Sequence, residues 1–282
     1  MTLSMCAIGD NVLDRYPQEG LAFPGGSATN AAVFASRLGV SSAYIGIVGS
    51  DASARFIEEC LEAEGVDASR VQRQDGPNPT TDVVVDDDGN RRFIAHTPPE
   101  ATLRLRDDDL QFLRGVDWIH TGHSSYVEHE LDRMATLAPI SFDFSKRDLD
   151  YAAPLLPLVA VATFSRDDVA YDECVELLHA AVGLGAGFAL VTRGAQGAVA
   201  MTQGTVVEQA AKPTRVVDTI GAGDAFQTCL LTELLRGQDP QAALDSASSF
   251  AAETCTYRGS FGHERMLSEF ATRAGNGPID RA

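Results

Sequence analysis

The chain alternates short apolar runs with longer amphipathic stretches. The short runs carry few polar residues, as expected of strands that are covered on both faces of a parallel sheet. We expect these strands at residues 5–8, 43–48, 118–120, 139–144, 158–163 and 188–192. The stretches between them predict helices at residues 30–38, 52–64, 126–137 and 171–184. This alternation predicts an α/β fold in which helices cover both faces of one sheet.

Two segments depart from this alternation, at about residues 12–24 and 80–97. In both, polar and apolar side chains alternate with the period of two that is typical of strands with one exposed face. The second segment contains Asp88-Gly89, a strong hairpin signal. We therefore expect a small β-sheet lid inserted into a single domain over residues 1–282. After residue 215 the pattern predicts helices at about 222–236, 240–256 and 263–273.

Composition narrows the possible partners and the compartment. The 282 residues carry a formal charge of −18, which argues against a nucleic-acid partner because backbone phosphates attract Lys and Arg. We find neither an apolar run of about 18 residues nor the basic start of a signal peptide, so we expect a cytoplasmic protein with no membrane partner. The cysteines are odd in number and form no Cys-x-x-Cys pair, which predicts reduced core thiols. They are Cys6, Cys60, Cys174, Cys229 and Cys255.

The sharpest chemical signal is the segment 218–226, Asp-Thr-Ile-Gly-Ala-Gly-Asp-Ala-Phe. Apolar residues with helical spacing follow it, so the amides of Gly221, Ala222 and Gly223 are expected at a helix N-terminus. Unpaired amides at such a terminus attract phosphate. The only lysines, Lys146 and Lys212, do not follow a glycine, which excludes a P-loop.

Asp224 adds a carboxylate to this anion site. A carboxylate repels phosphate, so simple phosphate binding does not account for it. It is accounted for if Asp224 faces an acceptor hydroxyl and takes its proton during phosphoryl transfer. The alternative is that Asp224 only stabilises the start of the helix through the helix dipole.

Two motifs resemble one known family. Residues 218–226 resemble the C-terminal signature of ribokinase-like (PfkB) carbohydrate kinases, and the Gly-Gly-Ser-Ala-Thr-Asn run at 25–30 resembles their N-terminal motif. The motifs stand in the family's order, and the resemblance covers nearly the whole chain. It implies a ribokinase-like three-layer α/β/α sandwich with a β-sheet lid. It also implies ATP-dependent phosphorylation of a sugar hydroxyl, and a homodimer formed through the lid.

The resemblance also implies roles for individual residues. Gly221, Ala222 and Gly223 would form the anion hole beside the base, Asp224. The sugar site would comprise Asp10, Asn11, Gly25, Gly26, Asn30 and His120. The ATP site would comprise Ser165, Thr192, Gly194, Gly197, Thr219 and Ser249. Asp168 would help to hold Mg²⁺, although Ser165 replaces the family's asparagine beside it, and backbone carbonyls near Asp218 and Ile220 match the family's K⁺ site.

The segment 9–17, Gly-Asp-Asn-Val-Leu-Asp-Arg-Tyr-Pro, resembles the opening of fructoselysine 6-kinases and other fructosamine kinases. These enzymes phosphorylate the 6-hydroxyl of a fructose that is joined to an amino acid through C1. The amine and carboxylate of such a substrate suggest lid contacts from Asp14 and Arg92, whose alternative is solvent exposure. Asp143 and Lys146 follow a strand and could approach sugar or phosphate, or form a salt bridge.

Three functions remain open: a fructosamine 6-kinase, a PfkB kinase for another sugar or nucleoside, and a non-catalytic sugar-binding protein of the same fold. The pair His120 and His123 has no third ligand at zinc spacing, so no zinc site is predicted. A histidine at the end of this strand is expected to contact substrate or to be buried and hydrogen-bonded.

Overall fold

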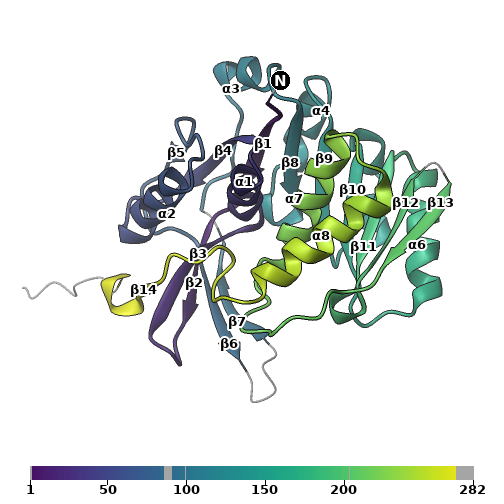
Figure 1. Ribbon diagram of the computed structural model, residues 1–282. Helices are drawn as coiled ribbons and strands as arrows, with labels where there is room; N and C mark the ends of the chain where they lie inside the picture. Colours follow the sequence, from purple (N-terminus) through teal and green to yellow (C-terminus); the bar gives the residue numbers. More distant parts are fainter. Residues whose placement is uncertain (1, 86–90, 99, 203, 271–282) are drawn as a thin grey trace, which may run out of the picture.

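The computed structural model describes residues 2–85, 91–98, 100–202 and 204–270, without the side chains of 85 and 91–93 (Figure 1). Its main sheet has nine strands in the order β13-β12-β11-β10-β9-β8-β1-β4-β5. Neighbouring strands pair parallel, except that β12 is antiparallel to β11 and β13. The strands are β1 (Ser4–Gly9), β4 (Ser41–Val48), β5 (Gln72–Arg73), β8 (Trp118–Gly122), β9 (Ile140–Ser145), β10 (Val161–Ser165), β11 (Phe188–Thr192), β12 (Ala198–Thr202) and β13 (Thr205–Gln209).

Helices cover both faces of this sheet, as the apolar runs predict. In β1, Met5 and Ala7 face one layer, while Cys6 and Ile8 face the other. The first layer holds α1 (Ser27–Arg37), α2 (Ala52–Ala63), α7 (Ala222–Leu235) and α8 (Pro240–Thr254). The second holds α3 (Asp107–Leu113), α4 (Leu131–Ala135), α5 (Leu149–Ala152) and α6 (Tyr171–Gly183). The three-layer α/β/α fold is confirmed.

A second, smaller sheet projects from the main body and contains both segments expected to form the lid (Figure 1). Its order is β14-β3-β2-β6-β7. Tyr16, Phe23 and Val83 form a small apolar cluster with Ile220, which precedes α7. The Asp88-Gly89 hairpin signal lies outside the described residues. The strands are β2 (Val12–Tyr16), β3 (Leu21–Gly25), β6 (Thr80–Val85), β7 (Arg91–Thr97) and β14 (Arg265–Met266).

The helix expected at residues 263–273 is wrong within the described part of the chain. Arg265 and Met266 pair with β3 instead, and a 3₁₀ turn, Leu267–Phe270, follows. The helix expected at 126–137 is reduced to α4, because Tyr126 has a left-handed φ of 53° and a 3₁₀ turn, Glu128–Glu130, separates it from α4. The strand expected from residue 158 begins at Val161, because a 3₁₀ turn, Leu156–Leu158, precedes it.

The cysteines and the lengths of the helices bear on two further features of the chain. All five cysteines are buried and free, so the prediction of reduced core thiols is confirmed. None of the helices in the described ranges is long and apolar enough to cross a bilayer.

Candidate active site

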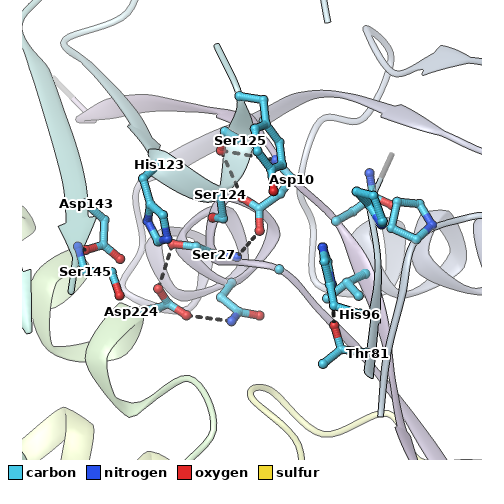
Figure 2. Close-up of a pocket in the computed structure, with 18 of the residues that line it drawn as sticks. Asp10, Ser27, Thr81, His96, His123, Ser124, Ser125, Asp143, Ser145 and Asp224 are labelled. Atoms are coloured by element: carbon cyan, nitrogen blue, oxygen red, sulfur yellow. Dashed lines mark hydrogen bonds between the residues drawn. The ribbon is translucent and has the colours of Figure 1, made fainter. Parts of the chain in front are cut away.

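A cavity of about 770 Å³ opens at the carboxyl ends of the central strands (Figure 2). There β1 lies between β4, which follows it in the main sheet, and β8, from which the sheet continues in the opposite direction. Ligands of α/β proteins bind at such switch points. The walls come from the ends of β1 and β9, the starts of α1 and α7, the 3₁₀ turn His123–Ser125, and the lid strands β2, β6 and β7.

Asp224, in the first turn of α7, lies at one end of this cavity. Its carboxylate accepts hydrogen bonds from Ser27 Oγ (2.8 Å), Asn30 Nδ2 (2.7 Å) and Gln227 Nε2 (3.2 Å). Ser27 and Asn30 belong to α1 and stand almost 200 residues earlier in the chain. The fold therefore joins the N-terminal and C-terminal motifs at one carboxylate.

The surroundings of Asp224 change its acidity. Burial raises its pKa to about 7, and the negative charge of Asp143 acts in the same direction. The hydrogen bonds from Asn30 and Ser27 oppose this rise. Burial also raises the pKa of Asp143. Asp224 therefore titrates near neutral pH, where a general base combines sufficient ionisation with sufficient basicity.

The start of α7 offers an anion site. Gly221 has a left-handed φ of 75°, and a Cβ there would lie 2.5 Å from Ser260 Cβ, so this turn needs glycine. The Ala222 amide donates to Thr219 O at 3.3 Å. The Gly223 amide has no acceptor in the described ranges, and apart from the adjacent residues and the backbone of α7 no heavy atom lies within 4 Å of the position a Cβ would take. The helix start is thus open to a phosphate oxygen.

Glycines also permit close packing at the start of α1. Gly26 has a φ of 110°, and a Cβ there would lie 2.7 Å from Asn11 Cα and 2.9 Å from Asp10 O. A Cβ on Gly25 would lie 2.1 Å from Oδ2 of the buried lid residue Asp14. The Gly-Gly turn therefore brings α1 against the end of β1 and the lid.

Asp10 lines the cavity and also fixes the start of α1. Its Oδ2 accepts from the Ser27 amide at 2.8 Å, and its Oδ1 accepts from the Ala28 amide at 3.2 Å and from Ser125 Oγ at 2.9 Å. A carboxylate at a helix N-terminus is favoured by the helix dipole. Asp10 thereby positions Ser27, which donates to Asp224.

Asn11 and His120, both expected in the sugar site, have side chains that contact the protein interior instead. Asn11 lines the cavity, but its side chain donates to Tyr44 Oη (3.0 Å) and Ile47 O (2.7 Å) and accepts from Asn78 Nδ2 (2.9 Å), so it ties β1 to β4. The structure does not bring His120 to this cavity.

His120 lies between the sheet and α7, beside Ser141 Oγ at 2.8 Å, and burial lowers its pKa to about 4. His123 lines the cavity instead, because it follows the last residue of β8 whereas His120 points from within the strand. Position relative to the strand end is the signal that separates the two histidines. The sequence also gave no indication of His96 and Thr81, a lid pair 3.1 Å apart that lines the cavity.

The residues expected at ATP lie outside the described cavity lining. Ser165 and Thr192 pair at the ends of β10 and β11, and Gly194 and Gly197 flank the turn after β11. A Cβ on Gly197 would lie 2.0 Å from Gln209 O, which accounts for that glycine by packing alone.

Thr219 and Ser249 are two further residues expected at ATP, and Asp168 and Asp218 are residues expected near metal ions. Asp168, Thr219 and Ser249 are exposed, and Ser249 Oγ donates to Asp245 O at 3.0 Å. Buried Asp218 accepts from Tyr16 Oη (2.9 Å) and from the amides of Ile220 (2.7 Å) and Gly259 (3.0 Å). Within the described ranges, no group of three or more His, Cys, Asp or Glu could hold a metal ion. Arg92 lies in β7, but its side chain is outside the described part.

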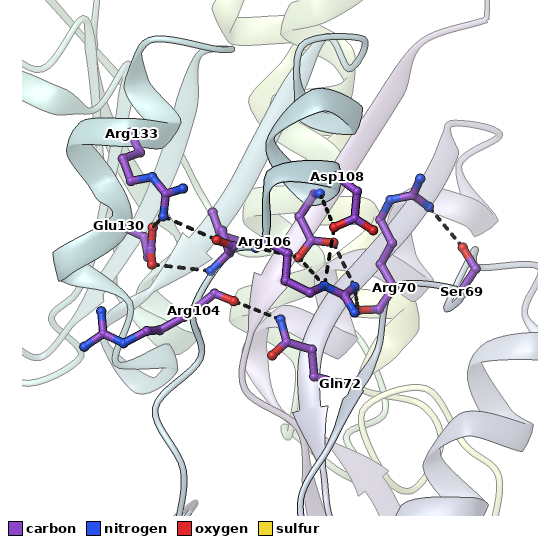
Figure 3. A network of polar contacts seen from close by, with 10 residues as sticks. Ser69, Arg70, Gln72, Arg104, Arg106, Asp108, Glu130 and Arg133 are labelled. Atoms are coloured by element: carbon purple, nitrogen blue, oxygen red, sulfur yellow. Dashed lines mark hydrogen bonds and ion pairs between the residues drawn. The ribbon is translucent and has the colours of Figure 1, made fainter.

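A polar network outside the cavity anchors the segment that leads from the lid to α3 (Figure 3). Leu103 lines the cavity, and two residues later the Leu105 amide donates to buried Glu130 at 3.3 Å. Arg133 Nη1 donates to Glu130 at 2.7 Å and to Leu105 O at 3.3 Å. This network holds one wall of the cavity against the second helix layer.

Known proteins resemble this chain along most of its length. A family model described as pfkB family carbohydrate kinase matches residues 8–263. The fructosamine kinase FrlD of Bacillus subtilis is 39% identical over 266 residues, covering 93% of this chain and 94% of the relative. The fructoselysine 6-kinase of Escherichia coli is 32% identical over 262 residues, covering 92% and 99%.

Solved structures share the fold of this chain. Arabidopsis thaliana ribokinase complexed with ribose and ATP has a TM-score of 0.77 at 21% identity, covering 93% of this chain and 95% of that one. Fructokinase from Vibrio cholerae in its fructose-, ADP- and calcium-bound form has a TM-score of 0.75 at 25% identity, covering 92% and 95%. With its fold, its two motifs and the family match in agreement, the chain belongs to the pfkB family of carbohydrate kinases.

Proposed function

We propose that this carbohydrate kinase transfers the γ-phosphoryl group of ATP to the 6-hydroxyl of a fructosamine such as fructoselysine. The observation that carries the substrate class is the charge of the cavity. Among its described lining residues, four carboxylates, those of Asp10, Asp14, Asp143 and Asp224, stand against a single arginine. Such a cavity favours a substrate that carries an ammonium group, which a fructosamine has at C1. The 39% identical fructosamine kinase supports the same class.

In this reaction Asp224 accepts the proton of the acceptor hydroxyl while Ser27 and Asn30 hold its carboxylate in place. The acceptor oxygen forms a bond to the γ-phosphorus as the bond from that phosphorus to the bridging oxygen breaks and ADP leaves. The Gly223 amide and the dipole of α7 stabilise negative charge on the transferred group. Asp168 would hold Mg²⁺, because carboxylate oxygen suits this ion, and the bound ion would offset charge on the phosphates.

The sugar site has an unsatisfied acceptor of its own. Asn30 Oδ1 is buried without a hydrogen-bond partner in the described chain, while the Nδ2 of the same side chain is bound to Asp224. A buried unpaired carbonyl oxygen is costly unless a ligand supplies a donor. A sugar hydroxyl beside Asp224 would supply it, and Asp10 and Asp14 would accept further hydroxyls or the ammonium group.

A substrate panel tests this assignment. We expect kcat/KM for fructoselysine to exceed that for fructose, ribose or adenosine by at least about tenfold, since a lost charged contact costs on the order of 1.5 to 3 kcal/mol. ADP release is measured for each acceptor, with and without K⁺. Turnover of fructose or ribose without turnover of fructoselysine would refute the fructosamine assignment. Sugar binding without any ADP release would favour the non-catalytic alternative.

The pH profile should report the acidity of Asp224. The pKa of this carboxyl is raised to about 7, and the base acts only when ionised, so kcat/KM should fall as the pH drops below about 7. Asp143→Asn removes a nearby negative charge, which should lower the pKa of Asp224. The acidic limb of the pH profile, where kcat/KM falls, should therefore move to lower pH. Asp167→Asn is the control, because Asp167 pairs with Lys146 away from the cavity lining. An unmoved limb in Asp143→Asn would contradict the coupling of the two carboxyls.

A further inference from the structure

Arg147 is a cation in the cavity wall that the reaction described above does not use. It follows β9, and it is the only arginine among the described lining residues, which include no lysine. The kinase reaction brings a phosphoryl group to this cavity, whose described lining also includes four aspartates. A negatively charged wall repels that group unless a cation offsets it.

The loop that carries Arg147 is held in a defined shape. Ser145 has a left-handed φ of 49°, and its amide donates to Asp143 Oδ1 at 2.7 Å, which supports this uncommon conformation. Arg166 Nη1 donates to Ser145 O (2.8 Å) and Ser165 O (2.7 Å), while its Nη2 donates to Arg147 O (2.6 Å). The loop after β9 is therefore tied to the end of β10, where ATP is expected, and Arg147 in this loop also lines the cavity.

The guanidinium of Arg147 remains available. Its Cζ lies 4.9 Å from the centroid of the Tyr151 ring, and it has no hydrogen-bond or ion-pair partner in the described ranges. Tyr151 is itself fixed by a hydrogen bond to Glu128. The neighbouring Lys146 differs, because its ammonium binds Asp167 at 2.7 Å and the residue does not line the cavity.

We propose that Arg147 binds the phosphoryl group in transit, and that its N–H groups donate to the oxygens of that group as it moves from ADP to the acceptor. A planar guanidinium offers two parallel donors to phosphate, which an ammonium cannot match. The Gly223 amide would then bind the group from α7 and Arg147 from β9. The role follows from kinase activity and is independent of which sugar is phosphorylated.

Arg147→Ala should lower kcat by about 10² to 10³, the usual effect of removing one donor to transition-state charge, and leave KM for the sugar nearly unchanged. Arg147→Lys should recover less than about tenfold of this loss, because it restores charge without the paired donors. Lys146→Ala removes the adjacent charge outside the cavity lining and should keep kcat within roughly twofold. Melting temperatures of the variants, equal to that of the unmodified chain, exclude a folding defect as the cause.

A second measurement distinguishes whether Arg147 binds the phosphoryl group or a carboxylate on the sugar substrate. The assays are run with fructoselysine and with a fructosamine of an uncharged amine, or with any sugar that the chain phosphorylates. An equal loss of kcat on each acceptor supports the proposal. A loss confined to fructoselysine would assign Arg147 to the amino-acid carboxylate and overturn it, as would an unchanged kcat. In calorimetry, Arg147→Ala should weaken the binding of a non-hydrolysable ATP analogue more than the binding of ADP. An equal loss of affinity for both nucleotides would also overturn the proposal.

Discussion

Asp224→Asn should lower kcat by about 10² to 10⁴, the contribution of a positioned general base, with little change in ATP affinity. The asparagine keeps the size of the side chain and one acceptor for Asn30 or Ser27, but it cannot take a proton. Steady-state ADP release gives kcat, and calorimetry gives the affinity for ATP. Near-normal turnover would return Asp224 to the alternative of a carboxylate that only stabilises the start of α7.

The same variant has a stability signature that distinguishes loss of the base from loss of the fold. The pKa of Asp224 rises from 3.8 to about 7 on folding, so ionisation of the folded chain costs stability, and this cost grows between those pH values. Asparagine does not ionise. We therefore expect Asp224→Asn to melt above the unmodified chain at pH 8, with the difference shrinking toward pH 5. A variant that is inactive and melts lower at pH 8 would indicate damage to the fold.

Gly26→Ala should lower both the turnover rate and the stability of the protein. The φ of 110° is unfavourable for alanine, and the new Cβ would lie 2.7 Å from Asn11 Cα. The start of α1 must then move away from Asp10, which displaces both Ser27 and Asn30 from Asp224. A shift of about 1 Å at a catalytic group can cost on the order of 10²-fold in rate, and the backbone strain costs about 1 to 3 kcal/mol.

Gly20→Ala is the matched control for this variant. Gly20 also has a positive φ, of 70°, but no heavy atom beyond its two chain neighbours lies within 4 Å of the position of an added Cβ. The free energy of unfolding of Gly20→Ala should fall by only about 1 kcal/mol, because alanine disfavours this backbone conformation. Chemical denaturation measures the free energy of unfolding of both variants, and ADP release measures their rates. Equal losses of rate would show that the close approach at Asn11 is unimportant.

The sequence carried enough information for the main sheet and the lid, because buried parallel strands are continuous apolar runs and lid strands alternate. It was insufficient where tertiary contacts overrode local pattern. Residues 265 and 266 have a helical pattern, yet their backbone pairs with β3. The antiparallel strands β12 and β13, which extend the sheet edge, were likewise not expected.

Some residues of the candidate site could be predicted from the sequence, and others could not. Asp224, Gly26 and Asn30 belong to motifs whose residue types reflect their surroundings, so sequence alone indicated them. His120 and His123 differ only in whether the side chain points into the helix layer or past the strand end, and three residues of sequence do not reveal that. Arg147 was overlooked because its position depends on Arg166, which reaches across from the neighbouring strand.

The hydrogen bond between Asn30 and Asp224 joins positions 194 residues apart. A nascent or partly folded chain that lacks α7 can thus contain the whole Gly-Gly turn and the start of α1 and still have no base. The interval between synthesis of the first motif and the last exceeds about ten seconds at ordinary rates of translation. Catalytic competence is therefore acquired late and all at once, and turnover in a refolding experiment should report completion of the entire fold.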